Sequence, residues 1–156
     1  MLSLTRKTDY ALLALTYLAM RPDEVLSARE VAERFSLSSG LLMNVLKQLG
    51  SAGMVDSVRG AHGGYRLAQS PERITLAELI DTMEGPVRLA PCVGGGDGDG
   101  DGSNGCGARS LCPIQGPLQL LHDRLREFFG EITLAELVAV ESQRGSEGGN
   151  VGAQQP

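Results

Sequence analysis

The sequence predicts a mainly α-helical fold: a winged helix-turn-helix with a small β-hairpin wing, followed by a long C-terminal dimerisation helix. Two short helical segments are separated by a tight turn, and the second has a polar outer face, which is the helix-turn-helix pattern. Two strand-like segments around a Gly-rich turn follow directly. Aromatic residues make up only 4% of the chain and Trp is absent, so the core must be largely aliphatic, as in helical proteins.

Length and charge narrow the class of protein. The 156 residues suit one compact domain with appendages. Residues 1–70 carry eight Lys/Arg against six Asp/Glu, a net of +2, whereas residues 71–156 carry six against thirteen, a net of −7. This asymmetry indicates a nucleic-acid-binding face on the N-terminal half only. The sequence offers neither a nucleophile–base pair nor a phosphate-cradling loop, so we do not expect an enzyme.

The apolar run near the N-terminus predicts a buried helix from Thr5 to Met20 and not a membrane segment. Its densest part, Tyr10–Met20, spans eleven residues, too few to cross a bilayer. A signal-peptide cut after Ala19 would place the bulky Tyr17 where a small residue is needed. We therefore expect a cytoplasmic protein with no membrane partner. The helix should end at Arg21-Pro22-Asp23, because proline disfavours helix at the residue before it.

The helix-turn-helix follows this first helix. Ser27 and Glu30 form a capping box that begins a short helix, and Ser36–Ser39 is a tight turn. A third helix is predicted from Ser39 to Ser51, with apolar residues at i, i+3, i+4 and i+7. These apolar residues are Leu42, Val45, Leu46 and Leu49.

The outer face of the third helix is the predicted DNA-reading surface. Asn44 and Lys47 can hydrogen-bond base edges in the major groove, and Met43 lies on the same face. The hydroxyls of Ser38 and Ser39 can reach phosphates. The competing interpretation is that these residues are merely the solvated polar face of a small helical domain.

The wing is predicted from two short strands, Met54–Val58 and Tyr65–Leu67, around the turn Arg59–Gly64. Arg59 and His62 lie at its tip. An arginine on a thin Gly-rich wing can enter a narrow minor groove, where the potential is most negative. We interpret His62 as a phosphate contact or an exposed turn residue, not as a metal ligand.

The second half of the chain repeats one helix start. Ile74–Leu79 and Ile132–Leu137 have the same sequence, Ile-Thr-Leu-Ala-Glu-Leu, with Thr and Glu as a capping box; we interpret this as one start signal used twice and not as a repeat architecture. A helix at Pro117–Phe129 carries the predicted dimer surface, and residues 142–156 form a Gly/Gln/Ser-rich tail that we expect to be disordered. The dimer residues are Leu118, Leu121, Leu125 and Phe128.

All three cysteines of the chain fall in one 21-residue stretch from Cys92 to Cys112. Cys92 and Cys106 have thirteen residues between them, and Cys106 and Cys112 have five, so neither gap is the C-x-x-C of a zinc knuckle. Thiolates are soft ligands suited to iron–sulfur clusters or zinc. The alternative of three incidental thiols is weak, because none lies in the predicted core.

Two other candidate ligand groups near the cysteines are discounted. The acidic Gly-rich insert from Asp97 begins like an EF-hand loop, but its twelfth residue is Ala108 where a bidentate Glu is needed, so a spacer is the better interpretation. His122, ten residues after Cys112, is predicted to be a surface residue and not a ligand. The chain thus divides into residues 1–84 (winged helix-turn-helix), 85–116 (cysteine loop), 117–141 (dimerisation and C-terminal helices) and 142–156 (tail).

At this point the sequence resembles the bacterial winged-helix iron–sulfur regulators of the IscR/NsrR type. The resemblance covers about residues 2–138 and rests on Leu4–Ala11, on Ser57–Leu67, on the three cysteines and on Ile132–Leu137. It implies a homodimer, a palindromic double-stranded DNA operator, and an iron–sulfur cluster, 2Fe-2S or 4Fe-4S, held by Cys92, Cys106 and Cys112.

The fourth cluster ligand is also inferred from the resemblance. IscR-like members carry a histidine three residues after the third cysteine, where this chain has Gln115, a poor iron ligand. NsrR-like members use an aspartate of the other subunit in the Thr-Asp of the first helix, which here is Thr8-Asp9. The resemblance therefore favours Asp9 of the partner subunit, so that loss or reaction of the cluster would shift the two recognition helices.

The resemblance implies a transcription regulator, usually a repressor, that senses iron–sulfur status, redox state or nitric oxide. Two alternatives stay open at the level of sequence. One is a metal-free thiol-switch regulator, and the other is an iron–sulfur handling protein whose winged helix binds a protein partner.

Overall fold

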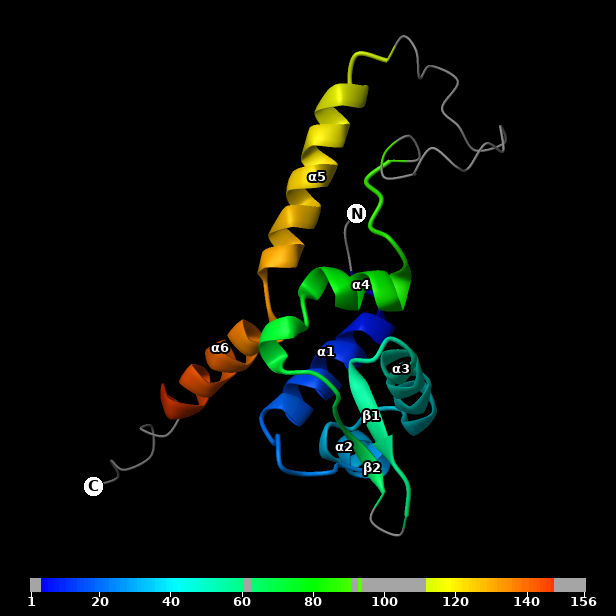
Figure 1. Cartoon of the computed structure of the whole chain (residues 1–156), viewed down its shortest axis with the longest axis vertical. Helices are drawn as coiled ribbons and strands as arrows, with labels where there is room; N and C mark the ends of the chain where they lie inside the picture. Colours follow the sequence, from blue (N-terminus) through cyan, green and yellow to red (C-terminus); the bar gives the residue numbers. More distant parts are fainter. Residues whose placement is uncertain (1–3, 61–62, 91–92, 94–111, 148–156) are drawn as a thin grey trace, which may run out of the picture.

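The computed structural model describes residues 4–60, 63–90, 93 and 112–147. It has the predicted winged helix-turn-helix architecture, which confirms the fold class (Figure 1). The wing lies at one end of the molecule and α5 at the opposite end (Figure 1). In chain order the elements are α1 (Arg6–Ala19), α2 (Ala28–Arg34), α3 (Ser39–Ser51), β1 (Val55–Val58), β2 (Gly64–Leu67), the 3-10 turn η1 (Pro71–Arg73), α4 (Leu76–Glu84), α5 (Gln115–Glu131) and α6 (Leu134–Glu147).

Helix α1 lies at the centre of the core, because its apolar residues occupy nearly every side of the helix. It packs against α3, α4 and α6. Helix α3 buries the four residues that its spacing predicted, and each fully buried Leu or Val contributes about 1.5–3 kcal/mol to folding. Ser27 caps α2 by accepting the Glu30 N–H at 3.1 Å, which is half of the predicted capping box.

The wing is a two-stranded antiparallel sheet whose register pairs Val55 with Leu67 and Val58 with Gly64. Its return strand also pairs with Leu26, two residues before α2: the Leu26 N–H donates to the Tyr65 carbonyl at 3.0 Å, and the Tyr65 N–H donates to the Leu26 carbonyl at 2.8 Å. A Cβ at Gly64 would clash with the Leu26 carbonyl, so this approach requires glycine. The wing is therefore fixed against the start of α2.

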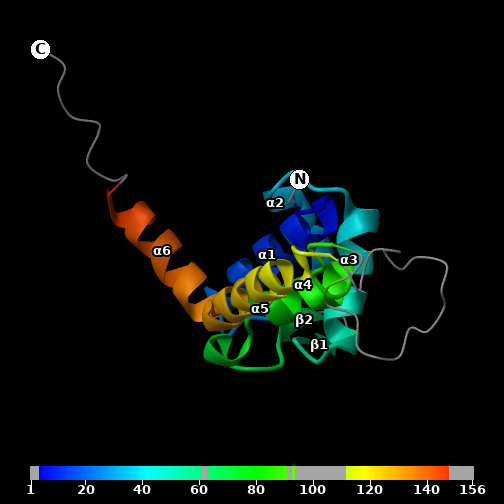
Figure 2. The ribbon, with the colours of Figure 1, turned by 90° about the horizontal axis from the view of Figure 1, so that it is seen from above.

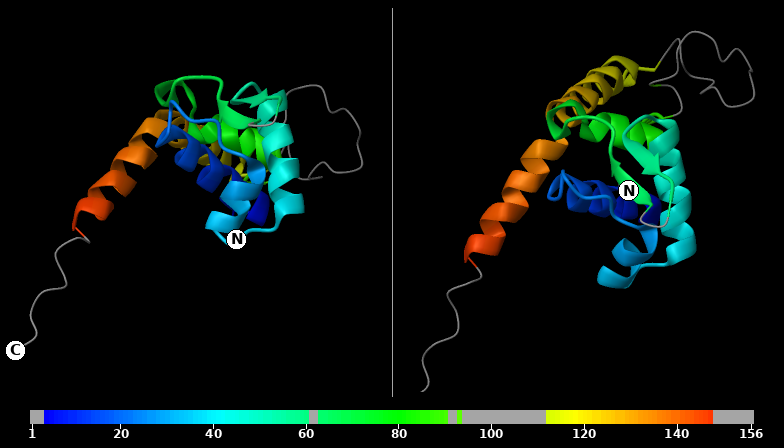
Figure 3. Two further views of the ribbon diagram at one scale, coloured as in Figure 1. Left: turned by 90° about the horizontal axis from the view of Figure 1, so that it is seen from below. Right: turned by 60° about the horizontal axis from the view of Figure 1, so that its bottom comes forward.

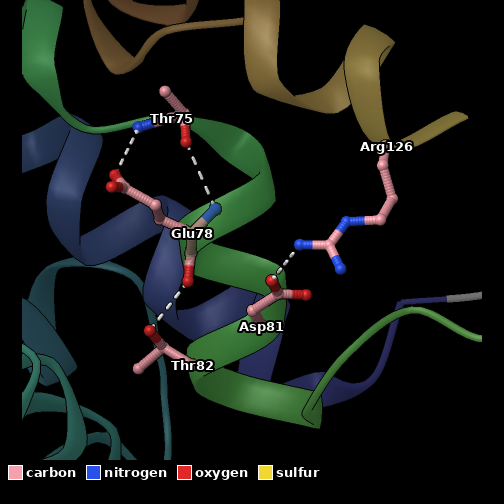
Figure 4. A network of polar contacts seen from close by, with 5 residues as sticks. All are labelled: Thr75, Glu78, Asp81, Thr82 and Arg126. Carbon is pink, nitrogen blue, oxygen red and sulfur yellow. Dashed lines mark hydrogen bonds and ion pairs between the residues drawn. The ribbon is translucent and has the colours of Figure 1, made fainter. Parts of the chain in front are cut away.

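The two copies of Ile-Thr-Leu-Ala-Glu-Leu meet in space, which the sequence did not predict. Thr75 and Thr133 form an antiparallel bridge in which the Leu76 N–H donates to the Ile132 carbonyl at 2.9 Å. The Leu134 N–H donates to the Ile74 carbonyl at 2.8 Å. Each copy closes its own capping box, and Figure 4 shows the one between Thr75 and Glu78. The starts of α4 and α6 are thus joined to each other.

Helix α5 contacts α4, and in Figure 1 the C-terminal end of α5 lies nearest to α4, while α6 extends away from the body (Figures 2 and 3). Arg126 of α5 bonds Asp81 of α4 at 3.1 Å (Figure 4). Helix α6 continues to Glu147, beyond the predicted start of the tail at residue 142. The Ser142 hydroxyl donates to the Val138 carbonyl at 3.0 Å, so propagation of a well-begun helix outweighs the polar composition there. None of the helices within the described ranges is long and apolar enough to cross a membrane.

Candidate nucleic-acid interface and sensor loop

The predicted reading residues of α3 lie together on its exposed side. Ser39, Asn44 and Lys47 are exposed, and Met43 is 39% exposed. Ser38, the N-cap of α3, is also exposed, and its backbone N–H donates to the Tyr10 hydroxyl of α1 at 3.3 Å. The N-cap of the helix that would read bases is therefore held by a residue near the start of α1.

A recess of about 450 Å³ joins α3 to the wing and to the start of α2. Met43 and Arg59, which are sixteen positions apart in sequence, both line it. Its full lining is Ser27, Ala28, Arg29, Met43, Ser57, Val58, Arg59, Gly60, Gly63, Gly64 and Tyr65. Hydroxyls, two guanidinium groups and the exposed backbone of Gly60 make this recess suited to a polyanionic ligand. His62, predicted at the tip of the wing, lies outside the described residues.

Arg29 is a member of this recess that the sequence reasoning missed. Its side chain is 85% exposed and bonds Glu33, one turn later, at 2.7 Å. The hydrogen bond and charge of Glu33 raise the pKa of Arg29, so the guanidinium stays cationic. The Leu26–Tyr65 pairing places α2 beside the wing, and only that long-range contact could have revealed the position of Arg29 in the recess.

The first turn of α1 is also tied to the base of the cysteine loop. Glu84, the last residue of α4, accepts the Thr5 N–H at 2.8 Å and a short hydrogen bond from the hydroxyl of Thr8, which is fully buried. These two donors, the Thr5 N–H first, lower the pKa of Glu84. Gly85 follows with φ of +82°, and the chain leaves α4 towards Cys92.

Thr8, Asp9 and Tyr10, three consecutive residues of α1, face three different parts of the protein. Thr8 bonds Glu84 at the stem of the cysteine loop, and Tyr10 bonds the N-cap of α3. Asp9, between them, is exposed and lines a largely apolar groove of about 650 Å³ between α1, the end of α2 and α6. A displacement of this part of α1 would therefore move both Glu84, at the stem of the cysteine loop, and the start of α3.

The predicted cysteine ligands lie only partly within the described residues. Cys112 is a half-buried free thiol, and its carbonyl accepts the N–H of Gln115, where α5 begins, at 3.4 Å. Cys92 and Cys106 are outside the described residues. Val93, next to Cys92, is buried at 1% exposure, and its N–H donates to Ala90 at 3.0 Å. Within the part of the chain that the structure describes, no group of three His, Cys, Asp or Glu side chains could hold a metal.

The prediction of a surface position for His122 is wrong. The residue is 3% exposed, and its Nδ1 has no hydrogen-bond partner among the described residues. It shares one face of α5 with Leu118, one turn before it, and Leu125, one turn after it, both half-buried. The burial follows from α5 packing on α4, which its sequence alone could not indicate.

The packing of α5 on α4 also divides the four predicted dimer residues into a half-buried pair and an exposed pair. Leu118 and Leu125 are half-buried, whereas Leu121 and Phe128 are 56% and 55% exposed. Leu120, at 57% exposure, adds to the open apolar surface. Helix α5 thus uses part of its apolar arc within the protein and leaves part uncovered by any described residue.

A reading helix and a hairpin wing that expose Ser, Asn, Lys and Arg on one side define a winged helix-turn-helix transcription regulator, a class of DNA-binding protein. The family assignment agrees with this class. Residues 4–140 match the Rrf2 family, described as iron-dependent transcriptional regulator, and the chain belongs to that family.

Individual relatives point the same way. The chain is 30% identical over 146 residues to the HTH-type transcriptional regulator NsrR of Halalkalibacterium halodurans, covering 91% of this chain and 94% of that protein. Among solved structures, it matches T. potens IscR with a TM-score of 0.69 and 25% identity, over 99% of this chain and 94% of that one. It matches CymR, the global cysteine regulator of B. subtilis, with a TM-score of 0.67 and 26% identity, over 90% and 98%. The named relatives are transcription regulators and not enzymes.

Proposed function

We propose that this chain is a homodimeric repressor that binds a palindromic operator and senses iron–sulfur status, redox state or nitric oxide through an iron–sulfur cluster. The cluster would be held by Cys92, Cys106, Cys112 and Asp9 of the partner subunit. The observation that carries the proposal is the start of α1, where Thr8 bonds Glu84 at the stem of the cysteine loop and Tyr10 bonds the N-cap of α3. A cytoplasmic location follows from the proposed role, because the regulator must reach DNA.

DNA reading is assigned to the α3 face and the wing. Asn44 and Lys47 would bond base edges, Ser38 and Ser39 would bond phosphates, and Arg59 with His62 would reach the adjacent minor groove. Arg29 would add a phosphate contact from the start of α2. In a two-fold dimer the two α3 helices would enter half-sites about 34–36 Å apart.

The donor set fits an iron–sulfur cluster by its chemistry. Three thiolates in one short segment are the ligands that iron–sulfur clusters use, and a carboxylate beside them would be a hard, more exchangeable ligand. When bound, the cluster would supply a centre that reacts with oxygen and nitric oxide. The names of the NsrR and IscR relatives and the iron-dependent family description support this assignment. Two-iron and four-iron clusters both fit three cysteines and one aspartate.

The signal would pass through α1 of each subunit. Asp9 is exposed, so it is free to reach a second subunit, while Thr8 and Tyr10 fasten the same turn to its own subunit. Release of Asp9 would let that turn move, and the Tyr10–Ser38 bond would carry the movement to α3. The spacing of the two reading helices would then change, and with it the operator affinity.

The open apolar side of α5 supports the proposed dimer. Leu120, Leu121 and Phe128 form a surface that a soluble monomer would expose to water. A two-fold axis near α5 would bury it and would leave the wing, at the far end of the molecule, free for DNA (Figure 1).

The test is the visible spectrum of protein purified without oxygen, compared for wild type, Asp9→Ala and the matched control Asp23→Ala, an exposed aspartate after α1. We expect a coloured, iron-containing protein whose spectrum or reactivity towards nitric oxide changes only in Asp9→Ala. An unchanged spectrum and an unchanged response in Asp9→Ala would remove Asp9 from the site.

A metal-free thiol switch is the second candidate. The similarity to the global cysteine regulator CymR favours it. Colourless protein without iron or labile sulfide, whose operator binding responds to thiol oxidation, would support this candidate against the cluster. The third possibility, an iron–sulfur handling protein that binds another protein, is disfavoured by the named relatives, which are transcription regulators.

A further inference from the structure

The exposed face of α3 contains one feature that phosphate contacts do not explain. Met43 is a large apolar side chain, 39% exposed, among the polar side chains of Ser39, Asn44 and Lys47. It can donate no hydrogen bond to a phosphate oxygen. Exposing it to water is unfavourable, so a ligand that covers it with an apolar group would gain affinity.

The local geometry leaves Met43 open to a ligand. Helical side chains lean towards the N-terminus, so that of Met43 lies over the turn that contains Gly40. A Cβ at Gly40 would have no atom within 4 Å, so the space beside this turn is empty. Met43 also lines the recess that contains Arg29 and Arg59, which are assigned above to a phosphate and to the adjacent minor groove. An object held by these arginines would therefore lie next to the Met43 thioether.

We infer that Met43 is a specificity-determining residue that recognises the 5-methyl group of a thymine in the major groove. The thymine methyl is the apolar group that base edges present there, and it distinguishes T·A from the other pairs. The flexible thioether can adapt to its position. Enclosing one methyl group changes affinity by about fourfold, which sets the expected size of the effect. The inference rests on the proposed reading of DNA by α3.

The experiment replaces thymine by deoxyuridine, which removes the methyl group and leaves every hydrogen-bonding group in place. An operator is first selected from random duplexes with the full chain, both as purified without oxygen and after removal of iron. Each thymine of that operator is then replaced singly, and affinities are measured for wild type, Met43→Ala and Met43→Leu. Met20→Ala is the matched control, because Met20 is 45% exposed but is the C-cap of α1, outside the recess.

We expect deoxyuridine at one thymine of each half-site to weaken wild-type binding about fourfold. Met43→Ala should lose this sensitivity, while Met43→Leu and Met20→Ala should keep it. The assignment of Met43 would be overturned if no deoxyuridine substitution lowered the operator affinity of the wild type. It would also be overturned if Met43→Ala lost as much affinity on substitution as the wild type does. Either result would leave sequence-specific binding intact. Failure to select any sequence would instead count against the proposed function itself.

Discussion

Replacing Thr8 by valine should remove a hydrogen bond between α1 and α4 and lower the free energy of unfolding by an amount that depends on pH. The Thr8 hydroxyl is fully buried and donates to the Glu84 carboxylate, which also accepts the Thr5 N–H at 2.8 Å. Valine has nearly the shape of threonine, so the substitution removes one donor and leaves no cavity. The remaining acceptor, Glu84, is exposed and can turn to water.

The expected cost follows from the charge and exposure of the acceptor. A hydrogen bond to a charged group contributes about 1.5–3 kcal/mol, but solvent screens the exposed Glu84, and a buried methyl group offsets part of the loss. We therefore expect Thr8→Val to lower the free energy of unfolding by about 1 kcal/mol at neutral pH. Because folding lowers the pKa of Glu84 from its usual 4.5, this stability is present above that pH. It is lost as the pH falls through the folded value.

The assay is urea unfolding followed by circular dichroism at neutral pH and at an acidic pH well below the usual glutamate pKa of 4.5. One protein concentration should be used throughout, because the stability of a dimer depends on concentration. Thr16→Val is the control, since Thr16 is half-buried on the same helix but lines the apolar groove. Thr8→Val should cost little in a Glu84→Gln background. An equal cost at both pH values, or a full cost in that background, would refute the reasoning.

Three further substitutions test the other surfaces. Tyr10→Phe removes the acceptor of the Ser38 N–H and should lower the free energy of unfolding by about 0.5–1.5 kcal/mol. It should also weaken operator binding without changing the visible spectrum. Full operator affinity would contradict the proposed link between α1 and α3. Arg29→Ala should weaken binding about equally for all DNA sequences and lower the salt slope by roughly one, as measured by fluorescence anisotropy; an unchanged slope would exclude a phosphate contact. Phe128→Glu should shift the protein from dimer to monomer in sedimentation analysis, because it places a charge on the open apolar side of α5, and a persistent dimer would place the interface elsewhere.

Local signals in the sequence predicted much of the fold. The i, i+3, i+4, i+7 spacing in α3 identified all four of its buried residues, and the Thr-Glu capping box placed the start of α4 within one residue. Each of these features depends only on residues that lie within one or two helical turns of one another. The wing was equally readable, because a Gly-rich turn between two short strands has few alternatives.

The features that the sequence did not reveal depend on contacts between distant segments. Periodicity showed that α5 has an apolar arc but not that α4 covers part of it, so the burial of His122 and the division of the dimer stripe were missed. The Thr8–Glu84 bond joins residues 76 positions apart, and Arg29 joins the wing recess only through the Leu26–Tyr65 pairing. The cluster ligands came from the resemblance, because three thiolates alone are compatible with several metals.

The bridge between Thr75 and Thr133 has a consequence for how the cysteine loop can vary. It closes a ring of chain that contains α4, the cysteine loop and α5. Closure entropy rises only with the logarithm of ring size, so twelve extra residues such as Gly94–Gly105 would cost roughly 0.2 kcal/mol in a ring that runs from residue 76 to residue 132. The spacing of the first two cysteines can therefore lengthen while α5 rejoins the body at the same point.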